Sequence, residues 1–226
     1  MSSTLAQQSF PETEAIVNEN ISSYLKSVSL HAVIYSGKVE ARYTVGAVNY
    51  PYLDTDEFRT GILSFDGRVY SDVLIRLNQH LEELSVMSPG KNFSVMVPKN
   101  RIDYAIIDSL LIVHHQPESA DGIYMPEGFY IRLYNGENQV WKRDVYNLDM
   151  RQNHLYWENF FNKKTKIYVL KDGKYNPVKN KKTLLNIFSD KKKELNIMIK
   201  EHDIDFRANL EKAIVTVTNY YDELNK

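Results

Sequence analysis

The hydrophobic residues change their spacing twice along the chain, which divides it into three stretches. Residues 9–28 place apolar side chains about 3.6 residues apart behind a Ser-x-x-Glu start, which predicts an amphipathic helix. Residues 38–45 alternate between apolar and polar, which predicts a half-buried strand. The helical spacing returns after residue 178, over residues 184–201 and again over 210–224.

Short turns that contain glycine interrupt the middle stretch. Each stands between runs rich in β-branched and aromatic residues, and the four are Ser36-Gly37, Asp66-Gly67, Asn135-Gly136 and Asp172-Gly173. Glycine, and to a lesser degree Asn or Asp, tolerates the positive φ that a two-residue hairpin turn needs. The pattern therefore predicts four β-hairpins, the third joining strands near residues 129–134 and 139–143, and the fourth joining 166–170 to 174–178.

Three segments between the second and third turns have different patterns. Residues 92–97 alternate and end at a proline, which predicts a further strand. Residues 104–115 form an apolar block that is too short and irregular to assign as a strand. Residues 117–126 are polar and predict a loop.

Together these elements predict an α+β fold. We expect mainly an antiparallel sheet of hairpins, either open or curved into an open barrel, with an N-terminal helix and a C-terminal helical pair. Residues 1–8 are expected to be disordered or the remnant of a signal peptide, and residues 9–30 to form the N-terminal helix. Residues 31–180 are expected to form the antiparallel β domain, and residues 181–226 the helical pair packed on it.

Composition and charge narrow the class of partner. The chain has 226 residues, of which 43% are hydrophobic and 25% charged, as in ordinary globular proteins. Its 28 Lys and Arg oppose 29 Asp and Glu, so no overall field attracts phosphate backbones, and nucleic acid is not an expected partner. The longest aliphatic run is far shorter than the roughly 20 residues that cross a bilayer as a helix, so no transmembrane segment is expected.

Most common catalytic motifs are missing. The chain has no cysteine, which excludes disulfides, thiolate catalysis and iron–sulfur clusters. Its nine glycines are dispersed, so neither a Walker loop nor a dinucleotide fingerprint is present, and no Gly-x-Ser-x-Gly elbow occurs. We expect no cofactor, and the sequence favours a protein without enzymatic activity.

Two histidines are weak candidates for metal ligands. His114 ends the apolar block beside a loop with acidic residues, and His154 lies four residues before Glu158, a spacing that puts both on one face of a helix. Histidine commonly ends strands as an ordinary polar residue, so the sequence favours no metal site.

Aromatic residues are the most distinctive feature of the composition. There are sixteen tyrosines and two tryptophans. Tyr130, Trp141 and Trp157 are candidates for a binding surface, because exposed aromatic side chains mark interfaces. The alternative is that they are buried in the core.

Several segments resemble uncharacterised exported proteins of Gram-negative cell envelopes that have β-rich folds. These segments are residues 61–73 (GILSFDGRVYSDV), 128–136 (GFYIRLYNG), 165–174 (TKIYVLKDGK) and 181–194 (KKTLLNIFSDKKKE). The resemblance implies export and a β-rich fold, and it implies no activity. Thr4-Leu5-Ala6 also has the pattern of a signal-peptidase site. A periplasmic or envelope-associated location is therefore expected, with a cytoplasmic location as the alternative.

Three functions are consistent with these features. The first is a non-enzymatic interaction or structural module of the envelope, whose partner is a protein or another envelope component. The second is a carrier, which would hold an apolar or lipid ligand in a dry cavity between a curved sheet and helices. The third is a hydrolase with an unrecognised site, which would need a cleft joining a histidine to carboxylates.

Overall fold

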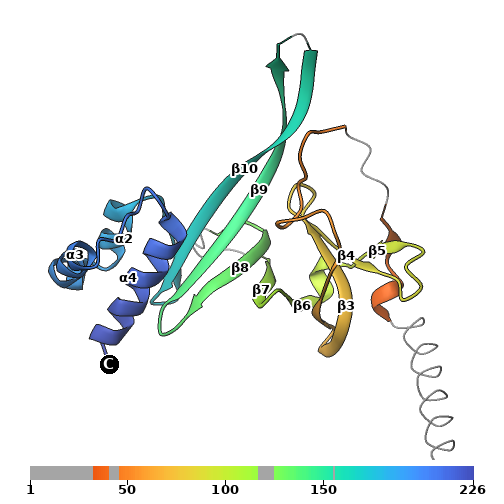
Figure 1. Cartoon of the computed structure of the whole chain (residues 1–226). Coiled ribbons are helices and arrows are strands. Elements are labelled where there is room, and N and C mark those ends of the chain that lie inside the picture. The colour runs from red at the N-terminus through yellow and green to blue at the C-terminus, as the bar shows by residue number, and fades with distance from the viewer. Residues whose placement is uncertain (1–32, 41–45, 117–124, 155) are drawn as a thin grey trace, which may run out of the picture.

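The computed structural model describes residues 33–40, 46–116, 125–154 and 156–226. Its main feature is one antiparallel sheet of eleven strands, and the C-terminal helices gather at one end of it (Figure 1). The predicted α+β class is thus confirmed, and the described sheet is not closed into a barrel. The helix predicted over residues 9–28, and residues 1–8 before it, lie outside the described residues.

Most strands follow one another along the chain with short connections, and the longest connection among them runs from β1 to β2. The strands are β1 (Lys38–Val39), β2 (Arg59–Phe65), β3 (Arg68–Asn78), β4 (Glu83–Met87), β5 (Ser94–Met96), β6 (Ile102–Ile107), β7 (Leu110–His115), β8 (Gly128–Asn135), β9 (Gln139–Asn153), β10 (Tyr156–Lys171) and β11 (Lys174–Val178). The α-helices are α2 (Lys181–Ile187), α3 (Lys192–Glu201) and α4 (Leu210–Leu224). The described residues also form three short 3-10 helices: η1 (Val33–Tyr35), η2 (Lys99–Arg101) and η3 (Ser189–Lys191).

Two antiparallel meanders meet in the middle of the sheet. The strand order is β1-β5-β4-β3-β2-β6-β7-β8-β9-β10-β11. Strands β2 to β5 form the first meander, and the chain then returns so that β6 pairs with the other edge of β2. Strands β6 to β11 form the second meander, which carries the helices.

Three of the four predicted hairpins are confirmed. Asp66-Gly67 joins β2 to β3 and Asp172-Gly173 joins β10 to β11, and all four residues have φ between 51° and 74°. This is the left-handed conformation that a two-residue hairpin requires. The Asn135-Gly136 turn lies between β8 and β9, as expected. It is not a two-residue turn, because Asn135 pairs with Gln139, and neither Asn135 nor Gly136 has a positive φ.

The prediction of a hairpin at Ser36-Gly37 is wrong. Gly37 lies between η1 and β1, and β1 pairs with β5 rather than with its sequence neighbour. A Cβ atom on Gly37 would lie 2.1 Å from the carbonyl oxygen of Met96. Glycine is needed here because the backbone of β5 passes so close, not because the chain turns back. The strand predicted over residues 38–45 is described only as far as Val39, and residues 41–45 lie outside the described ranges.

The apolar block over residues 104–115 is a hairpin that the sequence does not reveal. It contains most of β6 and all of β7, which pair with each other across Asp108 and Ser109. These two residues have φ values of 48° and 67°, so the turn is left-handed without any glycine.

Hydrophobic side chains form separate clusters on the two sides of the sheet. One spans the first meander and the adjoining strands β6 to β8, and it includes Leu63, Ile75 and Ile107. In the second meander, Val140, Ile167 and Val169 pack against α2, α3 and α4. The opposite face of the same strands carries a smaller cluster, which contains Met125, Tyr130, Trp141 and Tyr168.

A buried carboxylate fixes α4 to the sheet. Asp222 is 2% exposed and accepts hydrogen bonds from the hydroxyl of Tyr134 at 2.9 Å, the backbone N–H of Asn138 at 3.1 Å and the side-chain amide of Asn138. Burial, followed by the bond to Asp222, raises the pKa of Tyr134 to about 12, so its hydroxyl stays a donor. The helix is therefore held against the β8–β9 turn by polar as well as apolar contacts.

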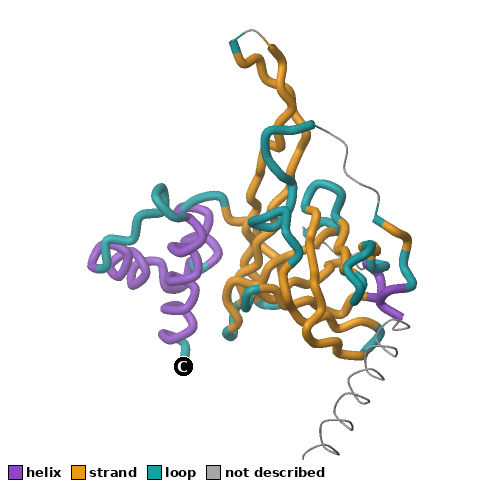
Figure 2. The backbone as a smooth tube through the Cα atoms, turned by 45° about the vertical axis from the view of Figure 1, so that its right-hand side comes forward, coloured by secondary structure: helices purple, strands orange, loops and turns teal. Residues whose placement is uncertain are grey.

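Strands β9 and β10 extend well past their neighbours and project from the body (Figures 1 and 2). Strand β8 pairs with β9 only over residues 139–142, and β11 pairs with β10 only over residues 167–171. The remainder, residues 143–153 and 156–166, is a two-stranded ribbon that we call the arm. The strands predicted over residues 139–143 and 166–170 were therefore far too short.

Candidate functional site

His114 lies inside the body, on β7. Its side chain is 1% exposed, and neither ring nitrogen forms a hydrogen bond with any described residue. The nearest carboxylate oxygen, from Glu127, is 3.6 Å from Nε2, and the ring lies 4.9 Å from that of Phe129. Burial, followed by the charge of Lys99, lowers the pKa of His114. The residue is a buried side chain, and its burial favours the neutral imidazole.

His154 and Glu158 do not lie on a helix. The prediction that they share one helical face is therefore wrong. His154 occupies the turn at the end of the arm with φ of 50°, and Glu158 is on β10. Glu158 accepts hydrogen bonds from Arg151 at 2.5 Å and from Asn153 at 3.2 Å. Across the described ranges, no group of three or more His, Asp or Glu side chains is arranged to hold a metal ion.

The three aromatic candidates fall in two different environments. Tyr130 is fully buried and Trp141 is 8% exposed, and both belong to the small cluster on the face away from the helices. Burial raises the pKa of Tyr130, whose hydroxyl donates to the backbone of Pro126. Trp157, on the arm, is 66% exposed. The structure therefore places only Trp157 at the surface.

Two more apolar side chains share the face of the arm that carries Trp157. In the β9–β10 register, Gln152 is opposite Trp157, Met150 is opposite Asn159 and Leu148 is opposite Phe161. Opposite residues of an antiparallel pair lie on the same face. Leu148, Met150 and Trp157 therefore form one surface, which we call the arm patch, and they are 37%, 68% and 66% exposed.

The other face of the arm carries charged, amide and aromatic side chains, several of which pair with one another. Arg151 and Glu158 form an ion pair, and the guanidinium of Arg151 lies 5.1 Å from the ring centroid of Phe160. Asn162 donates to Asp149 at 3.1 Å. Tyr156 on this face is 59% exposed, and its hydroxyl accepts from Asn153 at 3.2 Å. The arm patch differs in that its three exposed side chains are apolar, with no ion pair among them.

The root of the arm is fixed to the body along both of its edges. The side chain of Asn49 accepts from the backbone N–H of Phe161 at 2.7 Å and donates to its carbonyl at 2.9 Å. On the β9 side, Nδ1 of His80 lies 2.7 Å from the carbonyl oxygen of Tyr146. Phe161 itself is buried, and its ring lies 5.3 Å from that of His80. These contacts hold the arm patch in a defined position relative to the sheet.

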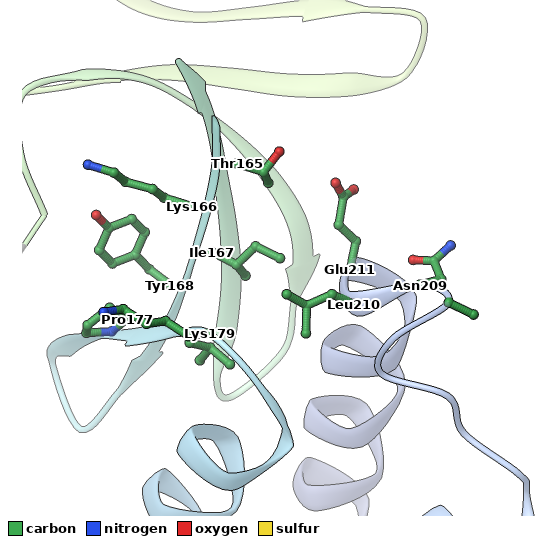
Figure 3. A pocket seen from close by; sticks show the side chains of 11 residues that line it. Thr165, Lys166, Ile167, Tyr168, Pro177, Lys179, Asn209, Leu210 and Glu211 are labelled. Atoms are coloured by element: carbon green, nitrogen blue, oxygen red, sulfur yellow. The ribbon is translucent and has the colours of Figure 1, made fainter. Parts of the chain in front are cut away.

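A second feature is an open groove where β10 and β11 face the start of α4 (Figure 3). Its volume is about 980 Å³, and its lining is Thr165, Lys166, Ile167, Tyr168, Pro177, Val178, Lys179, Ala208, Asn209, Leu210 and Glu211. Figure 3 shows Thr165 and Ile167 on the side of β10 that faces Leu210 and Glu211, whereas Lys166 and Tyr168 lie on the other side.

The acidic groups beside the groove are already engaged. The Nζ atom of Lys142 lies 3.1 Å from the carboxylate of Glu211 and 3.4 Å from that of Asp144. Asp144 is buried and also accepts from the hydroxyl of Thr165. The uncompensated charge in the groove lining therefore comes from lysines.

The comparisons with known proteins give no relative from which to transfer a function. No protein-family model, curated protein or solved structure matches this chain. Among the helices of the described part, none is long and apolar enough to span a membrane. The similarity to exported envelope proteins stays a prediction, and function has to be inferred from the arm and the groove.

Proposed function

We propose that this protein is a non-enzymatic interaction module of the cell envelope, which binds a protein partner through the arm patch. The observation that carries the proposal is the exposure of Leu148, Met150 and Trp157 on one face of a ribbon that projects from the body. The envelope location comes from the sequence resemblance, and the binding role comes from the arm.

The energetics of the arm favour a bound partner. A two-stranded ribbon is only marginally stable in water, and large apolar side chains on it add nothing while they are solvated. Burying one such side chain against a partner is worth about 1.5–3 kcal/mol. Tryptophan is also one of the residue types that are enriched among the energetically dominant residues of protein interfaces. Contact with a complementary surface would therefore stabilise the arm as well as the complex.

The surroundings of the patch indicate a protein rather than a charged polymer. Its neighbours on the same face are the uncharged amides of Gln152 and Asn159. Amides donate to and accept from peptide groups, and an apolar centre with a polar rim is the usual anatomy of a protein interface. The nearest charged pair, Arg151 with Glu158, is on the other face and is self-compensated.

The structure gives less support to the other two functions. A carrier would need a dry cavity, whereas the groove is open and lined in part by Lys166, Lys179 and Glu211. A hydrolase would need a histidine that a substrate can reach beside a carboxylate that can act, but His114 is buried and Glu158 is bound by Arg151.

The test begins by placing a photo-crosslinking amino acid at Met150 in the full chain, in cells that naturally make the protein. Ile197 on α3 is the matched control position, since it is a 56% exposed apolar residue away from the arm. We expect one protein to be crosslinked from position 150 and not from position 197.

The crosslinked protein is then purified and its affinity is measured. Met150→Ser combined with Trp157→Ser should raise the dissociation constant at least about tenfold, because hot-spot truncations cost more than about 1 kcal/mol each. Ile197→Ser should change it less than about twofold. Equal crosslinking from both positions, no adduct, or unchanged affinity in the double variant would refute the proposal. An adduct with a second copy of this chain would replace it with self-association.

A further inference from the structure

We infer that the groove beside α4 binds an extended acidic peptide segment, which adds as a strand to the edge of β10 at residues 163–165. The inference concerns a different surface from the arm patch and does not depend on the partner of the arm.

The edge of β10 is covered on both sides of residues 163–165 and open between them. Towards the tip, Asn49 pairs with the backbone of Phe161 and the N–H of Val48 donates to the carbonyl of Asn159. Towards the body, β11 begins its pairing where Val178 lies opposite Ile167. No backbone hydrogen bond from a described residue reaches this edge at the residues between.

The direction of the unpaired groups follows from the register. In an antiparallel strand, the N–H and C=O groups of alternate residues point to alternate edges. Those of Phe161 point away from β9, since they bond Asn49, and β10 pairs with β9 without any register shift. The N–H and C=O groups of Lys163 and Thr165 therefore also point away from β9. Two residues with outward donors and acceptors form a template for a short added strand.

The groove gives such a strand two different walls. Side chains that point to one side would contact Ile167 and Leu210, and side chains that point to the other would approach Lys166. An extended peptide alternates its side chains between these two directions. The site thus fits a segment in which apolar and acidic residues alternate.

The positive charge of the lysines near the groove favours acidic residues in the bound peptide. Lys164, Lys166 and Lys179 are exposed, and within the described part of the chain none lies within ion-pair distance of a carboxylate. The nearby carboxylates, Asp144 and Glu211, are held by Lys142. An acidic peptide would meet unmatched positive charge along the groove.

The neighbouring strand shows what a protected edge looks like in this protein. Pro177 lies opposite Tyr168 in β11, and proline has no N–H to offer to an incoming strand. Lysines can also guard an edge against pairing. Lysines that attract an acidic peptide and lysines that prevent strand pairing predict opposite results, because an edge protected from pairing binds no peptide.

The binding test uses the full chain and a fluorescein-labelled peptide in which valine and glutamate alternate. We expect the fluorescence anisotropy to rise on binding and the affinity to fall as salt increases. N-methylation of the peptide at alternate residues, in two separate sets, provides the matched control. One set should abolish binding and the other should not, since only one set of N–H groups faces β10. Equal effects of both sets, or equal binding of a peptide with lysine in place of glutamate, would overturn the inference.

A second measurement tests whether the peptide pairs with the backbone of β10 at residues 163 and 165. Amide hydrogen exchange by NMR should show the N–H groups of Lys163 and Thr165 slowed at least about tenfold by the peptide. Lys166→Glu with Lys179→Glu should weaken binding at least about threefold, whereas Lys193→Glu with Lys200→Glu on α3 should leave it unchanged. Unchanged exchange at residues 163 and 165 would refute strand addition.

The arm variants separate this inference from the proposed function. Met150→Ser with Trp157→Ser should bind the acidic peptide as the native chain does, because the arm patch is not part of the groove. If these variants lose the peptide, the groove is not an independent site and the inference fails.

Discussion

Replacing Asp222 by alanine tests whether one buried carboxylate holds the helices to the sheet. The substitution removes the acceptor for the hydroxyl of Tyr134 and for two donors of Asn138. A hydrogen bond to a charged group contributes about 1.5–3 kcal/mol, and the three are not additive. Tyr134 also keeps a contact with Asn219 at 3.1 Å. We therefore expect the free energy of unfolding to fall by about 3–5 kcal/mol, which is below the simple sum.

Urea unfolding followed by far-UV circular dichroism measures this loss, and two variants calibrate it. Asp222→Asn keeps one acceptor and should lose only about 1–2 kcal/mol. Glu223→Ala changes the neighbouring residue on α4, whose exposed side chain accepts from Asn219, and should lose less than about 0.5 kcal/mol. Amide exchange should show α4 opening more often in Asp222→Ala while β2 and β6 keep their protection. A loss below about 1 kcal/mol for Asp222→Ala, or equal losses for the Asp222 and Glu223 alanine variants, would refute the anchoring role.

Two other substitutions test the interior of the sheet. Burial lowers the pKa of His114, so the unfolded chain binds more protons just below the ordinary value of about 6.5, and stability should fall as the pH drops through that region. His114→Phe should reduce this dependence in urea titrations at several pH values, and an unchanged dependence in this variant would contradict the assignment. Gly61→Ala would place a Cβ 2.3 Å from the carbonyl oxygen of Ile106, so it should cost more than about 2 kcal/mol. Gly67→Ala meets open space and should cost about 1 kcal/mol from its positive φ alone, so equal losses for the two would contradict the close approach of β2 and β6.

The sequence predicts hairpins where glycine provides the left-handed residue and misses them where other residues do. Asp66-Gly67 is recognisable because glycine has no Cβ to clash at positive φ. Asp108 and Ser109 adopt the same conformation at a small energetic cost, which the surrounding β6–β7 pairing offsets. Ser36-Gly37 shows the converse error, since Gly37 is required by a close approach to β5 that depends on the fold as a whole.

The arm was missed because neither of its faces is buried along its whole length. A strand shows alternation when one face packs on a core and the other meets water. Residues 147, 151, 152, 163 and 164 are all exposed polar residues, although they lie on different faces of the ribbon. The alternation of apolar and polar residues is therefore lost in the arm, even though β9 and β10 pair without a break from the Gln139–Leu170 pair to the Asn153–Tyr156 pair.

Exposure of the two tryptophans depends on where neighbouring strands end, which explains why their sequence positions alone could not separate them. Trp141 lies where β8 and β10 flank β9, whereas Trp157 lies beyond the last pairs of both β8 and β11. The same mismatch in strand length leaves the edge of β10 open at residues 163–165. The arm patch and the open edge beside the groove thus have one structural origin, because β9 and β10 are longer than the neighbouring strands β8 and β11. The two sites lie on different parts of these long strands. The arm patch lies on the part of the arm towards its tip, whereas the open edge lies at residues 163–165, next to the point where the pairing with β11 ends.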